Sequence, residues 1–237
     1  MKKILNFCSR FGVRKMVPLI KRKFHGEPIF FLKTQDKICF LTVDDAPGEE
    51  AQTNQNLLQI LKQYNVKATF FVISGQINEK NQRFMHDLLK DGHELGNHMV
   101  KNEPMHNYSA ETFERNLLEC EKILSIYDKE FTWKKLKLFR PPFGKISKEM
   151  PGILKKNHYE TILGDLYSFD YHINDAFFHI KYLSENISKG SIIILHFPGK
   201  SKNLQTLEIL KEMIPNIQSK GYKFELLGKF IKERNVN

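Results

Sequence analysis

Short apolar runs alternate along the chain with longer segments that carry apolar residues at helical spacing. Short runs rich in β-branched and aromatic residues predict buried strands, whereas a period near 3.6 residues predicts amphipathic helices. The predicted strands are 38–43, 67–73, 94–97, 137–140, 159–163, 191–196 and 223–227. The predicted helices between them are 52–64, 81–91, 110–127, 148–157, 177–189 and 204–220.

This alternation predicts a parallel sheet with helices outside it. About seven strand–helix units in roughly 200 residues favour a (β/α) barrel, and a doubly wound open sheet is the alternative that the pattern leaves open. Both architectures place the active site at the carboxyl ends of the strands. Polar residues fall at or just after four of those ends: Asp44, Asp45, His98, Arg140 and His196. We therefore expect these side chains to converge on one edge of the sheet.

The charge of the chain is concentrated near its start. The 237 residues carry a net charge of +10, but eight of the 37 basic residues precede the first acid, Glu27. The rest of the chain holds 29 basic residues against 27 acidic ones, which disfavours a nucleic-acid-binding face. The three cysteines, at positions 8, 39 and 120, are widely spaced, so neither disulfides nor a thiolate zinc site are expected.

Residues 1–36 are predicted to form a basic arm ahead of a domain at 37–237. In the arm, apolar residues from Ile4 to Phe11 have helical spacing among basic ones. The first interpretation is a helix that packs on the domain, and the alternative is an amphipathic segment, residues 1–24, on an anionic membrane surface. Basic residues interrupt the apolar ones, so no secretory signal is predicted, and no run is long enough to span a membrane. We expect a cytoplasmic protein.

The acid pair beside histidines indicates a metal site. Zinc takes histidine nitrogens and carboxylate oxygens, and a catalytic site keeps one position open for water. Asp45 and His98 can supply two ligands, while Asp44 faces the water as a general base. Successive strand side chains point opposite ways, so the acids can divide these tasks only at the turn after the strand. The alternative is a pair of solvated loop acids.

Five segments resemble, in order and spacing, the motifs of the NodB-type polysaccharide deacetylases, carbohydrate esterase family 4. They are LTVDDAPG (41–48), DGHELGNH (91–98), FRPPFG (139–144), LGDLYSFDY (163–171) and IIILHF (192–197). The resemblance extends from about Lys37 to about Phe230. It implies a distorted (β/α) barrel that removes N- or O-acetyl groups from glycans with a divalent metal. Zinc is the expected ion, with Co²⁺, Ni²⁺ and Mn²⁺ as alternatives.

The resemblance also implies roles by position. Asp44 matches the base and Arg140 the arginine that orients it. Asp170 matches the acid that tunes the catalytic histidine, and His196 matches that histidine, the general acid. Asp45 and His98 match metal ligands. The implied substrate contacts are Pro142, Phe143, Tyr171 and Leu195. By contrast, His158, His172 and His179 are predicted to be surface or packing residues.

The second motif departs from the family. The family reads His-Ser/Thr-x-x-His, whereas this chain has Asn102 at the third ligand position. A neutral amide oxygen is a poor zinc ligand, so Glu103 or His106 is the expected substitute. The predicted function is a metal-dependent deacetylase of an N-acetylated sugar, a chitin- or peptidoglycan-like polymer or a lipid-linked glycan. The alternative is a catalytically weak or inactive sugar-binding pseudoenzyme of the same fold.

Overall fold

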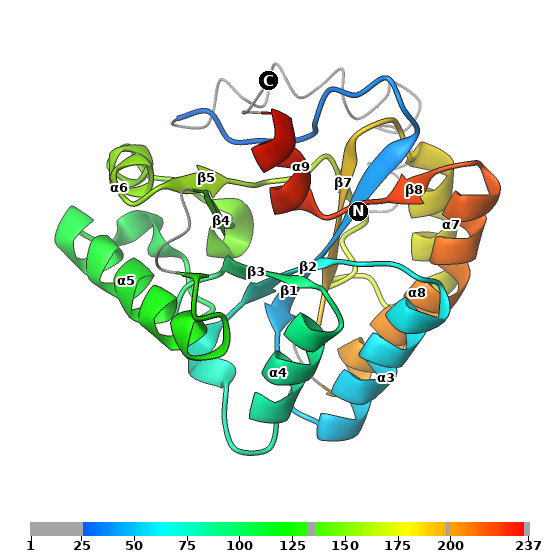
Figure 1. Ribbon diagram of the computed structural model, residues 1–237, viewed down its shortest axis with the longest axis horizontal. Coiled ribbons are helices and arrows are strands. Elements are labelled where there is room, and N and C mark those ends of the chain that lie inside the picture. The colour runs from blue at the N-terminus through cyan, green and yellow to red at the C-terminus, as the bar shows by residue number, and fades with distance from the viewer. Residues whose placement is uncertain (1–25, 132–135, 198–199, 235–237) are drawn as a thin grey trace.

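The computed structural model describes residues 26–131, 136–197 and 200–234, without the side chains of Lys200, Ser201 and Asn203. Its strands form one curved sheet in the order β5-β4-β3-β2-β1-β7-β6, and β8 pairs with β1 (Figure 1). The strands are β1 (Ile38–Ala46), β2 (Thr69–Val72), β3 (Glu94–Asn97), β4 (Lys137–Phe139), β5 (Tyr159–Thr161), β6 (Leu166–Tyr167), β7 (Ser191–His196) and β8 (Lys223–Phe224). All of these strand pairs are parallel.

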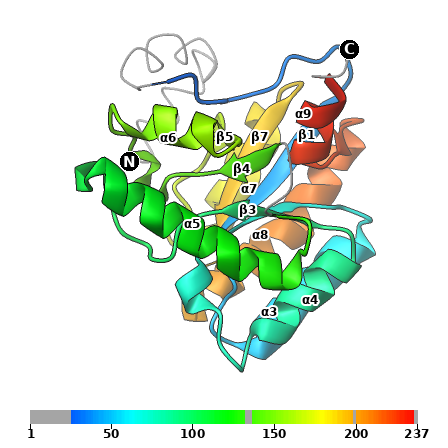
Figure 2. The ribbon, with the colours of Figure 1, turned by 60° about the vertical axis from the view of Figure 1, so that its left-hand side comes forward.

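Helices cover the outside of this sheet, and Figure 2 shows α5 and α6 in front of β3, β4 and β5. The α-helices are α3 (Ala51–Gln63), α4 (Gln82–Lys90), α5 (Ala110–Tyr127), α6 (Met150–Lys156), α7 (Ala176–Asn186), α8 (Lys200–Ser219) and α9 (Leu227–Arg234). The predicted fold class, a distorted (β/α) barrel, is confirmed as a half-barrel of seven parallel strands along the main path. The sequence missed β6 and α9, and α9 begins where the last predicted strand was expected to end.

Two apolar clusters fill the two faces of the sheet. In β1, Cys39, Leu41 and Val43 join the main core under the helices, whereas Phe40 belongs to a smaller cluster inside the half-barrel. Leu227 and Ile231 of α9 join that inner cluster. Because side chains alternate along a strand, Thr42 and Asp44 share the inner face with Phe40. The inner face therefore changes from apolar to polar toward the carboxyl end of β1.

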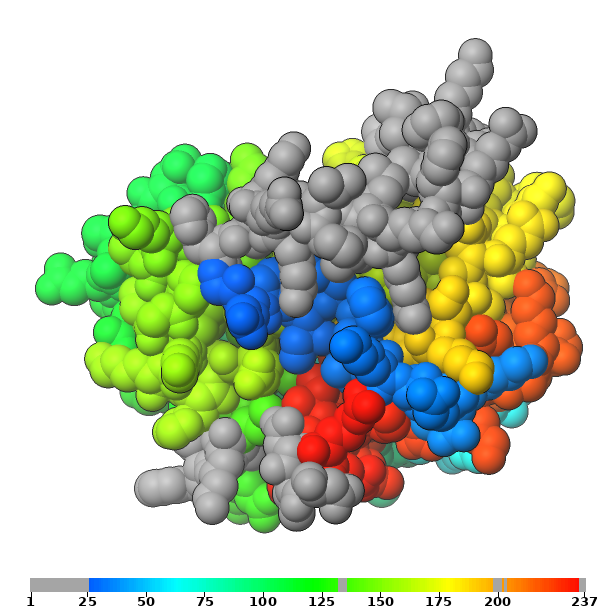
Figure 3. Space-filling model, turned by 90° about the horizontal axis from the view of Figure 1, so that it is seen from above, coloured from blue at the N-terminus to red at the C-terminus, as the bar shows by residue number. Residues whose placement is uncertain are grey.

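Residues 27–32 bridge the two edges of the half-barrel, and we call them the bridging segment. Ile29 forms a bridge with Ile162, and Phe31 forms one with Ser191 at the start of β7. Figure 3 shows this blue segment between the yellow-green and the yellow and orange parts of the chain. This portion of the predicted arm is thus built into the barrel, because its backbone pairs with the residue after β5 on one side and with the start of β7 on the other. Residues 1–25, including the predicted amphipathic helix, lie outside the described residues.

None of the helices in the described part of the chain is both long and apolar enough to cross a membrane.

Candidate active site

A β-bulge brings both acids of the pair to the same cavity. Asp44 pairs with Phe71 and Ala46 pairs with Val72, so Asp45 is an extra residue in the ladder. Its φ of 62° is in the left-handed region, which Asp tolerates better than most residues. The bulge breaks the alternation of the strand, and both carboxylates line one cavity. The two acids are buried, at 3% and 2% exposure, rather than being solvated loop acids.

Arg140 follows β4 and holds one oxygen of Asp44. Its Nη1 donates to Asp44 Oδ1 at 2.5 Å and to Thr42 Oγ1 at 2.7 Å. Its Nε donates to the carbonyl of Ile162 at 3.2 Å. Burial lowers the pKa of Arg140, and the adjacent Asp44 carboxylate opposes that shift. Among the described residues, its Nη2 is a buried atom without a hydrogen-bond partner.

Asp170 grips His196 at two points. One oxygen of Asp170 accepts from the His196 backbone N–H at 2.7 Å, and the other lies 2.9 Å from ring Nδ1. Burial lowers the pKa of His196, but the charge of Asp170, its hydrogen bond and the Asp44 and Asp45 charges together raise it to about 9. The imidazolium therefore persists at neutral pH. Its Nε2 lies 3.9 Å from Asp44 Oδ2, on the opposite side of the ring from Asp170.

Asp45 and His98 fit a divalent cation. His98 Nδ1 lies 2.6 Å from the carbonyl of Arg140, so this nitrogen carries the proton and Nε2 keeps its lone pair. Nε2 lies 3.6 Å from Asp45 Oδ1. Two ligands bound to zinc at about 2.1 Å in tetrahedral geometry lie about 3.4 Å apart, which is close to this spacing. Burial raises the pKa of Asp45, and the charges of His98 and His196 oppose that shift.

Asn102, a weak metal ligand, stands at the third ligand position of the motif. Asn102 Nδ2 donates to Asp45 Oδ1 at 3.0 Å, so its amide is within reach of the predicted pair. The described residues contain no cluster of three or more His, Cys, Asp or Glu that could hold a metal. Neither Glu103 nor His106 therefore completes a set with Asp45 and His98. The amide oxygen of Asn102 is the remaining candidate for a third metal ligand, and amide oxygens suit harder ions than zinc.

One cavity of about 430 Å³ joins these groups. Asn102, Phe143 and Tyr171 line it together with the five polar residues predicted at strand ends. Two predicted substrate contacts do not line the cavity. Pro142 is buried, and the neighbouring Pro141 lines the cavity in its place. Leu195 packs in the main core. Leu195 faces away because β7 alternates, so Ile194 shares the inner face with His196.

Other lining residues were missed from the sequence. His172 lines the cavity although a surface or packing role was predicted, while His179 is buried as a packing residue. The remaining apolar wall comes from Phe30, Leu163, Tyr167, Phe169 and Ile194. Ile194 had a usable signal, since it lies two residues before a predicted site residue in a strand, and Leu163, Tyr167 and Phe169 lie in the motif LGDLYSFDY.

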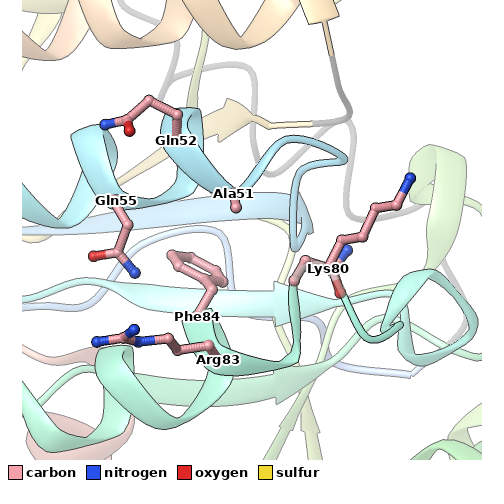
Figure 4. Close-up of a pocket in the computed structure, with 7 residues that line it drawn as sticks. Ala51, Gln52, Gln55, Lys80, Arg83 and Phe84 are labelled. Carbon is pink, nitrogen blue, oxygen red and sulfur yellow. The ribbon is translucent and has the colours of Figure 1, made fainter.

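A second cavity, of about 350 Å³, lies between the starts of α3 and α4 (Figure 4). Gln52, Gln55 and Phe84 line it with Lys80 and Arg83. Figure 4 shows the Lys80 side chain extending away from Phe84. Gln55 donates to Asp87, and Arg83 pairs with the same carboxylate. This cavity shares no lining residue with the one around Asp44.

Comparison with known proteins identifies the family. The profile of the polysaccharide deacetylase family matches residues 32–162, more than half of the chain. This chain belongs to the polysaccharide deacetylase family. It is 29% identical over 202 residues to a peptidoglycan-N-acetylglucosamine deacetylase of Bacillus cereus, covering 84% of this chain and 91% of the relative.

Solved structures show the same fold. A mutant of a Bacillus anthracis pseudoenzyme of carbohydrate esterase family 4, described as having restored activity, is 27% identical with a TM-score of 0.74, covering 86% of this chain and 70% of that one. A family 4 acetyl xylan esterase from Clostridium thermocellum, solved with a cobalt ion, is 26% identical with a TM-score of 0.71, covering 84% and 92%. The predicted family, and with it the class of carbohydrate deacetylases, is confirmed.

Proposed function

We propose that this polysaccharide deacetylase is a metal-dependent hydrolase that removes acetyl groups from an N-acetylated sugar, oligosaccharide or polysaccharide. The observation that carries the proposal is the position of Asp44, with one oxygen bound to Arg140 and the other facing His196 across the cavity. The name of the Bacillus cereus relative favours a peptidoglycan-like substrate, and a chitin-like or lipid-linked glycan has the same acetamido group.

Asp44 acts as the general base. Arg140 Nη1 donates to its Oδ1, so Oδ2 is the oxygen that accepts a proton from the attacking water. Thr42 fixes the guanidinium by accepting from Nη1 and donating to the carbonyl of Ile193 at 2.6 Å. The base therefore keeps one orientation relative to the cavity.

His196 acts as the general acid. Asp170 holds its ring through Nδ1, and the raised pKa keeps a proton on Nε2 at neutral pH. Nε2 then gives this proton to the sugar nitrogen as the bond between carbon and nitrogen breaks. The base and the acid are thus separate groups, and the Nε2 atom of His196 lies 3.9 Å from Asp44 Oδ2.

Asp45 and His98 hold the divalent cation, with Asn102 as a weak third donor. A bound divalent ion would act as a Lewis acid, which lowers the pKa of water and stabilises the negative charge that develops on the attacked carbonyl oxygen. Zinc is the proposed ion, with Co²⁺, Ni²⁺ and Mn²⁺ as alternatives. The cobalt ion in the acetyl xylan esterase supports a divalent ion in this fold.

The test is acetate release from chitin oligomers and peptidoglycan fragments in the presence of Zn²⁺, Co²⁺, Ni²⁺ or Mn²⁺. Asp44→Asn should lower kcat by roughly 10²–10⁴-fold, the usual contribution of a general base. Asp36→Asn is the matched control, because it makes the same charge change at an exposed residue. Equal acetate release from the wild type and Asp44→Asn would remove the proposed base.

The alternative is a weak or inactive pseudoenzyme that binds sugars. Two observations favour it: Asn102 is a poor third donor, and the Bacillus anthracis neighbour is described as a pseudoenzyme. A pseudoenzyme should bind the glycan equally well as the wild type and as Asp44→Asn. It should release no acetate even when the metal is saturating. Acetate release that depends on Asp44 excludes it.

A further inference from the structure

We propose that the cavity accepts N-acyl groups longer than acetyl, with the acyl chain lying against Phe30, Leu163 and Ile194. We call these three residues the acyl wall. The inference rests on the proposed hydrolase function and names the acyl class that this hydrolase removes. Phe30 belongs to the bridging segment and precedes residues 32–162, the part that matches the family profile.

The acyl wall lies deeper in the half-barrel than the reacting groups. Ile194 and His196 share one face of β7, and two residues of a strand span about 6–7 Å. The neighbouring strand has the same arrangement, because Thr42 pairs with Ile194 and Asp44 pairs with His196. A group that passes inward beyond Asp44 and His196 therefore meets Ile194.

Phe30 and Leu163 continue this wall across the edge of the sheet. The carbonyl of Ile29 accepts from Leu163 N at 2.8 Å and from Gly164 N at 3.2 Å, which fixes Phe30 beside Leu163. A Cβ added to Gly164 would lie 2.8 Å from the side chain of Ile194, so that side chain packs against the glycine backbone. Phe30 and Leu163 thus pack together, Ile194 packs on the adjacent Gly164, and all three side chains line the cavity.

The polarity of the acyl wall decides whether the sugar or the acyl chain of the substrate lies against it. Besides its oxygen, the carbonyl carbon that water attacks carries the sugar nitrogen on one side and the acyl chain on the other. The three wall side chains have no polar atom and are only 7–8% exposed, so sugar hydroxyls placed there would lose their hydrogen bonds. Phe143 and Tyr171 line the same cavity but are 65% and 44% exposed, which suits a sugar that remains partly in water. The acyl chain therefore points inward.

The room available exceeds that needed for a methyl group. A methyl is close in size to a water molecule, whose share of liquid volume is about 30 Å³. The cavity holds about 430 Å³ and is shared between the sugar and the acyl group. An acetyl group would leave part of the acyl wall uncovered, whereas a longer linear chain would cover it.

The reaction is the same for each acyl length. The water oxygen forms a bond to the acyl carbon, and the carbon–nitrogen bond breaks. Asp44 takes one proton from the attacking water, and His196 gives one proton to the leaving nitrogen. The proton on Asp44 then restores His196, and the new carboxylic acid gives the second water proton to the amine. The products are the free carboxylate and the protonated amino sugar, without any oxidant or co-reactant.

The experiment is a series of glucosamine trimers that carry N-acetyl, N-propionyl, N-butyryl or N-hexanoyl groups, assayed with the metal-loaded full chain. Each buried methylene is worth about fourfold in kcat/KM, so the butyryl substrate should exceed the acetyl one on the order of tenfold. Phe30→Trp should reverse this preference by filling the wall, and Phe30→Ala should extend it to hexanoyl. Phe177→Ala is the matched control, because Phe177 is 75% exposed and outside the lining.

A kcat/KM that falls steadily from acetyl to hexanoyl would overturn the inference while leaving the proposed hydrolase intact. Hydrolysis of none of the substrates would instead contradict the proposed function. In that case binding decides: calorimetry of the same series with Asp44→Asn should show affinity rising with acyl length and a more negative heat capacity change. Affinity that is independent of acyl length overturns the inference.

Discussion

Asn102 is the residue in which this site differs most from the family motif. Its amide hydrogen-bonds to Asp45, so the third position holds a neutral group within reach of the predicted ligand pair. Asn102→His should raise zinc affinity at least about tenfold, because imidazole nitrogen is a better zinc ligand than amide oxygen. Acetate release at limiting zinc should rise with it. Competition with a chromogenic chelator measures the affinity.

The matched control is Asn102→Ala, which removes the amide without adding a ligand and should not raise zinc affinity. If Asn102→His binds zinc no better than the wild type, the third ligand of this site is not at residue 102. In that case the weak donor set is not the feature that limits the metal.

His196 gives the site a predictable pH dependence. Its pKa is raised to about 9, so kcat/KM should fall as the pH rises above about 9 and the general acid loses its proton. The raised pKa also stabilises the folded state, fully below the unfolded pKa of about 6.5, and this contribution is lost as the pH rises through about 9. Asp170→Asn should move the alkaline limb of kcat/KM to lower pH. An unmoved limb would mean that another group titrates there.

For single residues, the sequence predicted the polar side chains that line the cavity well and the apolar ones poorly. Asp44, Asp45, His98, Arg140 and His196 were predicted to meet because strand ends meet, and all five line one cavity. Leu195 was wrong because the match by motif ignored strand alternation. Phe30 lies in the short apolar run IFFL (29–32), but that run was predicted to belong to the arm and not to the domain.

At the scale of elements, a buried ion pair connects α5 to the strands behind His98. Lys137 Nζ lies 2.8 Å from Glu121 Oε2, and Tyr159 donates to the same oxygen. Asn97 Nδ2 in turn donates to the Tyr159 hydroxyl at 3.1 Å, and its side-chain Oδ1 accepts from Met99 N at 2.8 Å. The network thus fixes the backbone on both sides of His98.

Lys137→Met should destabilise the fold by about 3–5 kcal/mol, because it leaves Glu121 buried without its cation. The control is Lys156→Met, which breaks another pair between a lysine and α5 at an exposed position and should have no measurable effect. Urea unfolding of the two variants measures the difference. Equal stability of the two variants would show that the buried pair contributes no more than the surface one.

The sequence predicted some elements with their exact bounds and missed or misplaced others. The helix at 110–127 and the strands at 94–97 and 191–196 have the predicted bounds. By contrast, β6 has two residues, too few for a period to be recognised, and it exists because Leu166 and Tyr167 pair with Ile193 and Ile194. The strand predicted at 223–227 is shorter because α9 begins at Leu227, whose side chain closes the inner cluster. Tertiary packing decided both cases.

At the scale of the whole molecule, the bridging segment joins the edges of the half-barrel at a tight contact. A Cβ added to Gly190 would lie 1.7 Å from the carbonyl oxygen of Leu32, and Gly190 has a φ of 76°. Gly190→Ala should therefore destabilise the fold by about 2 kcal/mol or more. Gly152→Ala, in α6 with no atom within 4 Å, should instead stabilise it by about 0.5–1 kcal/mol.

Thermal unfolding of the two variants gives opposite shifts if the bridging segment is part of the folded domain. A Gly190→Ala variant as stable as the wild type would show that residues 27–32 detach without loss. The sequence could not predict this closure, because strand alternation specifies a parallel sheet but not what covers its open edges. It placed these residues in an arm ahead of the domain.

The central claim is that a divalent ion held by Asp45 and His98 enables deacetylation by Asp44 and His196. The most direct measurement is acetate release from an N-acetylated glucosamine oligomer by metal-stripped protein as Zn²⁺ or Co²⁺ is titrated in. The account predicts no release without metal, release that saturates near one equivalent, and its loss in His98→Ala. Release that is unaffected by stripping, or absent at every metal concentration, would contradict the account.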